Sequence, residues 1–195
     1  MPKRTDYDLI DADVSYYPNF FGSHESNNYF EKLLKNTIWQ QDDITVFGKT
    51  YKQPRLTAFY AQNTLTYSYS NITMTPYKFN ADLRAIKKRV ETVCAVKFTS
   101  CLLNLYRDGQ DSNGWHADNE KALGQNPVIA SVSFGAERIF HLKHRQKPDQ
   151  LHKINLEHGS LLIMKGPTQH NWLHQIPKTK KDVGKRINLT FRVIK

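Results

Sequence analysis

One short segment, Gly114-Trp115-His116-Ala117-Asp118, carries the strongest chemical signal in the chain. In a β-strand, residues i and i+2 lie on one face, so the His116 imidazole and the Asp118 carboxylate would converge. Two imidazoles and one carboxylate form a facial triad whose open positions let Fe(II) oxygenases hold a cosubstrate and O₂ together, and zinc is the competing metal. The alternative is a hydrogen-bonded pair near a surface turn, so the metal hypothesis needs a third ligand.

Six histidines follow this pair and are candidates for the third ligand. We choose His174, because alternation in Trp172-Leu173-His174-Gln175-Ile176 places it on one face with two apolar residues. His170 is the second choice, since it lies nearer the Gly166-Pro167 turn. The other four lie beside lysines or in polar connections, where we expect solvated side chains: His141, His144, His152 and His158.

The last predicted strand, residues 186–193, separates apolar from polar side chains. Alternation places Ile, Leu, Phe and Val on one face, which packs, and four polar residues on the other: Arg186, Asn188, Thr190 and Arg192. The two arginines would be about 20 Å apart in a flat, fully extended strand, so they would serve two ends of one site. A dicarboxylate and its metal fit this spacing, because guanidinium groups bind carboxylates in a bidentate manner. The alternative is the solvent face of an edge strand.

Helices and strands at predictable places would position these residues. Apolar residues at helical spacing predict helices over about 24–36 and 81–95, the second with Asn80 as its N-cap. From about residue 98 the apolar period changes to two, and earlier segments at about 44–47, 56–60 and 65–69 would extend one sheet. Since strands follow helices without alternating with them, we expect an α+β, mainly β chain with an antiparallel sandwich or jelly-roll core. Its strands would be 99–106, 128–134, 138–143, 151–156, 160–164, 170–176 and 186–193.

Length and composition limit the class of protein. The 195 residues fit a single domain, and a net charge of +10 favours a polyanionic partner. The sequence contains no apolar run of the roughly 20 residues that a membrane span needs, and its start does not resemble a signal peptide. We therefore expect a soluble intracellular protein without a membrane partner. Cys94 and Cys101 have no Cys-x-x-Cys partner and are expected to be buried, reduced thiols.

The His-x-Asp pair, the distant histidine and the Arg-x-Asn-x-Thr-x-Arg segment together resemble the AlkB family of Fe(II)- and 2-oxoglutarate-dependent nucleic-acid dioxygenases. Residues 104–109, 131–135 and 159–162 are similar to further family segments, and the similarity covers about residues 40–195. Within the family, the chain looks most like the homologue that repairs alkylated duplex DNA. Residues 46–49 resemble the base-displacing finger of that homologue, and Pro54-Arg55 follows at a similar spacing.

The resemblance implies a fold and a set of ligands. It implies one domain over residues 1–195, with an N-terminal extension and a helix-containing nucleotide-recognition lid over about 1–95 and a double-stranded β-helix, or jelly-roll, core over about 96–195. In the family, the first arginine of the tail motif meets the distal carboxylate of 2-oxoglutarate, and the second lies near the ligand aspartate. The implied ligands of Fe(II) are His116, Asp118 and His174, and the implied neighbours of 2-oxoglutarate are Asn104, Tyr106, Arg186, Asn188, Thr190 and Arg192.

The implied reaction consumes O₂ and 2-oxoglutarate, yields succinate and CO₂, and removes N-alkyl lesions of the 1-methyladenine and 3-methylcytosine type as formaldehyde. The damaged base must leave the duplex, and Phe47 is the candidate wedge that fills the gap. As an alternative, Phe47 is an ordinary buried residue before a turn. The implied substrate-binding residues are Val46, Phe47, Gly48, Lys49, Arg55, Tyr67, Tyr69, Ser70 and Glu120.

Three of these residues would recognise the flipped base. Tyr67 and Tyr69 share a strand face and would stack against it, although an aromatic stripe of this kind is also typical of a core. Tyr69 stands where the duplex-repair homologue has Phe, which bears on the range of lesions. Glu120 matches the acidic residue that reads the exocyclic amine of the lesion in the family.

The expected partner is alkylated DNA, both duplex and single-stranded, and we expect the protein to act as a monomer. Its compartment would be the cytoplasm and nucleoid of a bacterium or the nucleus of a eukaryote. Two alternatives stay open from the sequence: an RNA demethylase of the same family, and a catalytically silent nucleic-acid reader on the same fold.

Overall fold

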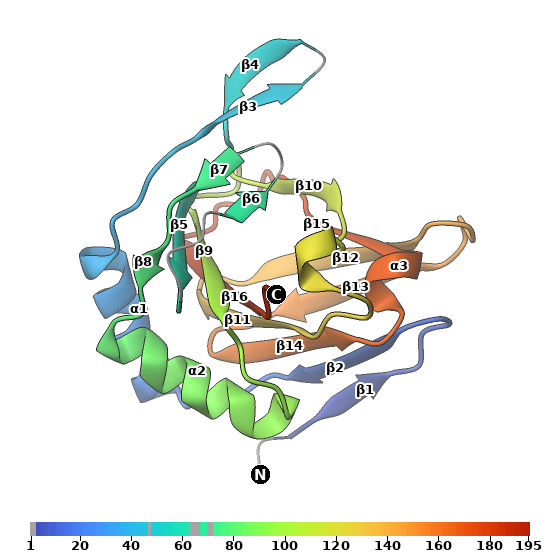
Figure 1. The fold of residues 1–195 in the computed structure, drawn as a ribbon, viewed down its shortest axis with the longest axis horizontal. Helices are drawn as coiled ribbons and strands as arrows, with labels where there is room; N and C mark the ends of the chain where they lie inside the picture. Colours follow the sequence, from blue (N-terminus) through green and yellow to red (C-terminus); the bar gives the residue numbers. More distant parts are fainter. Residues whose placement is uncertain (1–2, 47, 63–66, 70–71) are drawn as a thin grey trace.

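The computed structural model describes residues 3–46, 48–62, 67–69 and 72–195, and its core is a sandwich of two sheets (Figure 1). Within these residues, one sheet has eight strands in the order β1-β2-β14-β11-β16-β9-β5-β8 and the other has four in the order β10-β15-β12-β13. All pairs are antiparallel except β5 with β8. The larger sheet comprises β1 (Thr5–Tyr7), β2 (Asp13–Tyr17), β14 (Ser160–Lys165), β11 (Ile129–Gly135), β16 (Arg186–Arg192), β9 (Ser100–Tyr106), β5 (Leu56–Ala61) and β8 (Tyr77–Lys78). The smaller sheet comprises β10 (Asn113–His116), β15 (Trp172–Ile176), β12 (Arg138–His144) and β13 (Leu151–Leu156).

Helices α1 (Ser23–Asn36) and α2 (Ala81–Cys94) cover the outer face of the larger sheet. Their apolar stripes supply Leu33, Leu83, Ile86 and Val90 to a cluster with Ile187, Leu189 and Phe191 of β16. As predicted, Asn80 caps α2, and its side-chain oxygen accepts a hydrogen bond from the Leu83 amide at 2.8 Å. The other face of β16 therefore looks into the sandwich, where its polar residues are buried.

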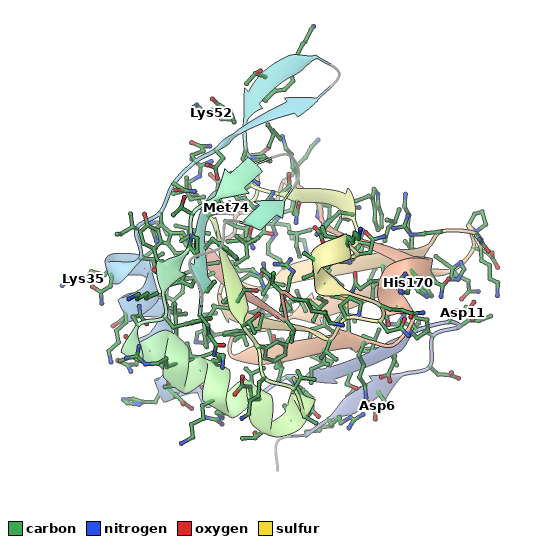
Figure 2. The ribbon with its side chains drawn as sticks, viewed as in Figure 1. Asp6, Asp11, Lys35, Lys52, Met74 and His170 are labelled. Carbon is green, nitrogen blue, oxygen red and sulfur yellow. The ribbon has the colours of Figure 1, made fainter. Side chains whose placement is uncertain are left out.

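Two β-hairpins lie between the helices in sequence, and they do not join the main sheets. Among the residues that the structure describes, β3 (Asp43–Val46) pairs only with β4 (Lys49–Lys52), and β6 (Tyr67–Tyr69) only with β7 (Ile72–Met74). Of the early segments expected to extend one sheet, only β5 does so, and the expectation is wrong for the other two. The first hairpin projects from the body, and Lys52 at its base forms an ion pair with Asp43 at 2.8 Å (Figure 2).

The strand predictions after residue 98 are confirmed within one or two residues, with one exception. Residues 170–171 belong to the short helix α3 (Thr168–Asn171), so β15 begins only at Trp172. Strands β1 and β2 were not predicted. In β2, Val14 and Tyr16 pack into the core between the sheets while Tyr17 packs under the helices, so both faces are buried and the alternating pattern is absent.

N-terminal strands share the larger sheet with the C-terminal half. β2 pairs with β14, and β5 pairs with β9, so residues 1–95 contribute four strands to the sandwich: β1, β2, β5 and β8. The division into an extension and a core near residue 96 stays a prediction. Among the described residues, no helix combines the length and the apolar character that crossing a membrane requires.

Both cysteines are free, as expected, but the expectation that both are buried is confirmed only for Cys101. Cys101 is fully buried, whereas Cys94 is only partly exposed. Burial raises the pKa of Cys94 to about 12, with a smaller contribution from the neighbouring Glu91 carboxylate. Burial also holds the pKa of Cys101 well above its usual range. Both side chains are therefore protonated thiols at neutral pH.

Candidate metal centre and cosubstrate pocket

The two histidines of the predicted triad are direct partners across the β10–β15 ladder. His116 pairs with His174, and their ring centroids are 4.2 Å apart. With Asp118, they form a group whose potential ligand atoms all lie within 4.8 Å of one another. The choice of His174 as third ligand is therefore supported by geometry, and a two-histidine, one-carboxylate set is typical of non-haem Fe(II) sites.

Asp118 reaches this group by a route that strand alternation did not predict. β10 ends at His116, so Asp118 lies in the following loop. Gln169 of α3 accepts a hydrogen bond from the Asp118 amide at 2.8 Å, and the Arg192 guanidinium donates one to the Asp118 carboxylate at 2.7 Å. Burial alone would raise the pKa of Asp118, but the charge of Arg192 and its hydrogen bond outweigh burial and hold the pKa below its usual value. The carboxylate is therefore ionised, as a metal ligand must be.

The histidines are neutral and suitably oriented for coordination. Burial lowers the pKa of His174 to about 3, with a further contribution from His116, and burial also lowers the pKa of His116. The His116 Nδ1 atom lies 2.7 Å from the Gly114 carbonyl oxygen, which can only accept, so Nδ1 carries the proton and Nε2 carries the lone pair. Phe140 stacks on His174 with a centroid distance of 5.2 Å and fixes the ring plane.

One pocket inside the sandwich connects this triad with the polar face of β16. In the larger sheet, Asn188 pairs with Asn104 of β9, and Arg186 pairs with Tyr106. The Asn104 side-chain amide donates to Asn188 at 3.3 Å. The alternative of a solvent-facing edge strand is wrong, because β16 lies between β11 and β9 and is buried along its whole length. The pocket brings together all nine predicted metal and cosubstrate residues: Asn104, Tyr106, His116, Asp118, His174, Arg186, Asn188, Thr190 and Arg192.

Arg186 provides the clearest test of whether an anionic ligand fits this pocket. Its side chain is buried, and burial lowers its pKa to about 10. Nη2 donates to the Ser133 hydroxyl at 2.8 Å, and the guanidinium carbon lies 5.2 Å from the centre of the Tyr106 ring. Among the described residues, Nε and Nη1 make no hydrogen bond of good geometry, and the Tyr106 side chain gives the guanidinium a weaker polar contact. A buried cation with unused donors is unfavourable, and a carboxylate placed against it would satisfy both.

The pocket thus has two chemically different ends joined by β16. At one end, Asp118 and two neutral histidines supply oxygen and nitrogen ligands for a divalent metal. At the other end, Arg186 supplies unused donors for an anion. This donor set fits Fe(II) together with a dicarboxylate such as 2-oxoglutarate.

The remaining histidines lie outside the triad. His170, the second choice for the third ligand, lies on α3, where its Nε2 accepts from the Asn126 amide at 3.4 Å (Figure 2). The expectation that the other four are solvated is wrong for His144, which is buried. Its Nδ1 accepts hydrogen bonds from the amides of Gln146 and Lys147. Because these bonds close a turn at the end of β12, the role of this imidazole is structural.

The predicted substrate residues lie at different places. Gly48, with φ at +75°, and Lys49 are exposed at the turn of the β3–β4 hairpin, and Glu120 follows Asp118 as the N-cap of the 3₁₀ helix Lys121–Leu123. Arg55 is buried and does not line the pocket, but it contacts a residue that does: it donates to the Asn104 side chain at 2.8 Å and also to the Ser112 carbonyl at 3.1 Å. Phe47 and Ser70 lie outside the described residues, as do the side chains of Val46, Tyr67 and Tyr69.

Several residues that complete the site were missed from the sequence. Ser131 and Ser133 of β11 accept hydrogen bonds from Asn188 and Arg186, both at 2.8 Å. Their alternation in the Ser131–Gly135 segment, beside a predicted polar strand face, was a usable signal. Gln169 and Phe140 are single residues on other elements, and nothing in the local sequence marks them.

Comparison with known proteins agrees with this geometry. A family model described as the 2OG-Fe(II) oxygenase superfamily matches residues 13–192. Alpha-ketoglutarate-dependent dioxygenase alkB homolog 3 of Homo sapiens is 42% identical over 190 residues, which cover 93% of this chain and 66% of that protein. DNA oxidative demethylase ALKBH2 of Homo sapiens is 37% identical over 91% of this chain and 72% of that protein. DNA oxidative demethylase ALKBH2 of Arabidopsis thaliana is 37% identical over 99% of this chain and 70% of that protein.

The fold is also similar to that of a solved structure. OsALKBH1 superposes with a TM-score of 0.70 at 18% sequence identity, over 97% of this chain and 100% of that one, which confirms the predicted jelly-roll fold. The chain spans slightly less than two thirds of the alkB homolog 3 proteins of Homo sapiens and Bos taurus. Since the family model covers nearly the whole chain and relatives retain more than a third of its residues, the protein belongs to the AlkB family within the 2OG-Fe(II) oxygenase superfamily.

Proposed function

We propose that this protein is an Fe(II)- and 2-oxoglutarate-dependent dioxygenase that removes N-alkyl lesions from DNA. The observation that carries the proposal is the two-ended pocket. A neutral-histidine and carboxylate triad lies at one end, and a buried arginine with unused donors lies at the other. The names of the relatives, a dioxygenase and DNA oxidative demethylases, supply the substrate class.

Each end of the pocket has a defined task in this proposal. His116, Asp118 and His174 hold Fe(II), and Arg192 keeps Asp118 ionised through the 2.7 Å hydrogen bond. Arg186 binds the distal carboxylate of 2-oxoglutarate, while Asn104, Tyr106, Asn188 and Thr190 line the space between the two ends. The bound iron and cosubstrate would supply the oxidising power: one oxygen atom of O₂ goes to succinate as CO₂ leaves, and the other hydroxylates the alkyl carbon. The hydroxylated carbon then leaves the base as formaldehyde.

The protein around the triad would exclude water and position the cosubstrate. Phe140 stacks on His174, and the pocket wall also contains the apolar side chains of Leu102, Leu156 and Met164. Excluding water and stray reductants protects the oxidising site until a substrate carbon is in place. The buried network from Arg55 through Asn104 to Asn188 holds the polar wall rigid.

The surface features agree with a nucleic-acid substrate. The net charge of +10 favours encounter with a polyanion, and the β3–β4 hairpin presents Lys49 at its turn. We propose that Phe47 fills the gap left by a flipped base and that Tyr67, Tyr69, Ser70 and Glu120 contact the base itself. We propose that Arg55 lies near the substrate and also supports Asn104 of the pocket wall through its hydrogen bond.

Formaldehyde and succinate release by the reconstituted protein tests the proposal. The protein is loaded anaerobically with Fe(II) and 2-oxoglutarate, and O₂ is added with 1-methyladenine or 3-methylcytosine in duplex DNA, single-stranded DNA or RNA. We expect lesion-dependent formaldehyde on DNA that is lost in His174→Ala and retained in the matched control His170→Ala. Phe47→Ala should lower turnover on duplex more than on single strands.

Two outcomes would contradict parts of this assignment. Higher turnover on methylated RNA than on DNA would favour the RNA demethylase. No turnover on any methylated nucleic acid, with Fe(II) and 2-oxoglutarate bound normally, would reject alkylation repair and point to another substrate class. Salt-sensitive DNA binding should persist in His116→Ala while formaldehyde release vanishes, which separates binding from catalysis.

A further inference from the structure

Arg138, the first residue of β12, is a buried arginine whose side chain binds backbone carbonyl groups. Its Nη1 atom donates to the Asp108 carbonyl at 3.1 Å. Its Nη2 atom donates to the Asp111 carbonyl at 3.0 Å and to the Pro177 carbonyl at 2.6 Å. Burial lowers the pKa of Arg138, so keeping a cation here costs stability.

These carbonyl groups belong to the two chain segments that flank the metal-binding ladder. Asp108 and Asp111 lie in the connection that leads into β10, and Pro177 directly follows β15. At this end, the outermost ladder pair is Asn113 with Ile176, while His116 and His174 form the pair at the metal. The Arg138 guanidinium therefore bridges the two chains just beyond the open end of the ladder. The pairing of β10 with β15 is short, because the strands have only four and five residues. The three hydrogen bonds of Arg138 connect the two chain segments beyond the end of this pairing.

The same guanidinium also contacts the cosubstrate end of the pocket through Tyr106. The guanidinium carbon of Arg138 lies 5.7 Å from the centre of the Tyr106 ring, and that of Arg186 lies 5.2 Å from it. Hydrogen bonds also hold the segment after Tyr106 in a turn. The backbone amide and two guanidinium nitrogens of Arg107 donate to the Asp111 carboxylate. Tyr106 is thus held by Arg138 as well as by Arg186.

We infer that Arg138 is a positioning residue for both ligands of the proposed reaction: it sets the spacing of His116 and His174 through the β10–β15 ladder and the orientation of Tyr106 beside Arg186. Arg138 does not line the pocket, so it acts only through these neighbours. A lysine would fill this role only in part, because its single nitrogen replaces the two terminal nitrogens with which the guanidinium binds the three carbonyl groups. This inference rests on the proposed function for the identity of the ligands.

The test compares Arg138→Met and Arg138→Lys with the exposed control Arg145→Met. Calorimetry measures the binding of Mn(II), as a redox-stable substitute for Fe(II), and then of 2-oxoglutarate to the Mn(II)-loaded protein. Steady-state assays measure KM for 2-oxoglutarate, KM for the methylated oligonucleotide and the ratio of succinate to formaldehyde. We expect Arg138→Met to weaken both ligands at least tenfold and to raise the succinate-to-formaldehyde ratio, with the oligonucleotide KM unchanged within twofold. Arg138→Lys should recover part of the loss, and Arg145→Met should match the wild type.

A lower melting temperature with Mn(II) and 2-oxoglutarate affinities within twofold of wild type would overturn the inference, because Arg138 would then be only structural. If Arg138→Met does not fold, Arg138→Lys decides by the same criteria. A wild-type protein that binds both ligands but turns over no nucleic acid refutes the proposed function, and the two binding constants still test Arg138.

Discussion

Replacing Arg186 by Met should change stability and cosubstrate affinity in opposite directions. In the protein without ligand, burial lowers the pKa of Arg186 from its ordinary value to about 10. Each pKa unit corresponds to about 1.4 kcal/mol, so keeping the cation buried costs about 3 kcal/mol at neutral pH. The folded state holds this proton less tightly than the unfolded state, so the cost is present below about pH 10 and disappears as the pH rises toward the ordinary pKa of an arginine. Methionine removes the charge while keeping an apolar side chain of similar length.

The contribution of Arg186 to the binding free energy of 2-oxoglutarate follows from its two unused donors. Nε and Nη1 would each form a charge-assisted hydrogen bond with a carboxylate, worth about 1.5–3 kcal/mol. Loss of both corresponds to about 3–6 kcal/mol, or a factor of roughly 10² to 10⁴ in affinity for 2-oxoglutarate. Removing the buried cation should at the same time raise the free energy of unfolding of the unliganded protein by about 1–3 kcal/mol.

Urea unfolding of Arg186→Met with and without Mn(II) and 2-oxoglutarate measures both quantities, with Arg145→Met as the control for loss of one positive charge. The wild type should be stabilised strongly by 2-oxoglutarate, and the variant hardly at all. A variant that is less stable than wild type without ligand but keeps its 2-oxoglutarate affinity would refute this reasoning.

Three further perturbations test other parts of the structure. Asn80→Ala removes the N-cap of α2 and should lower the free energy of unfolding by about 1 kcal/mol in urea, whereas Asn80→Asp should be nearly neutral. Gln169→Leu removes the acceptor of the Asp118 amide and should weaken Mn(II) binding about 10- to 100-fold in calorimetry, while His170→Ala leaves it unchanged. His174 has a pKa of about 3 in the folded protein and 6.5 when free. Below about pH 6.5 the unfolded chain binds a proton that the folded protein excludes, so the free energy of unfolding falls as the pH is lowered toward 3. The metal-free protein should therefore lose about 3 kcal/mol between pH 7.5 and 4.5 in urea titrations, and His174→Asn should flatten this dependence.

Residues whose placement depends on strand alternation were predictable. The polar face of β16 and the choice of His174 over His170 both follow from a period of two in a single segment. Asp118 reached the site for a different reason than expected, because it lies beyond the end of β10 and is held by Gln169 and Arg192. The grouping of Asp118 with the two histidines was therefore expected from the sequence, although the local geometry that produces it was not.

Other features depend on contacts that no single segment encodes. Arg138 binds carbonyl groups 27 to 39 positions away in the chain, and Gln169 binds the Asp118 amide 51 positions away. The sequence around these two residues has no pattern that marks a buried polar role. Strand β2 was missed because its neighbours bury both of its faces. His144 was expected in solvent because of the adjacent Lys143, yet the turn after β12 folds over it.

Because His116 pairs directly with His174, the metal proposed for this site would bind only to molecules in which β10 and β15 are correctly paired. If β10 slipped by one residue against β15, one of the two imidazoles would point away from the pocket, and a slip by two would place His116 opposite Trp172 or Ile176. Only the native pairing creates the two-histidine ligand set. A metal that binds this set stabilises only correctly paired molecules, so metal supply during synthesis should raise the yield of correctly folded protein as well as loading the enzyme.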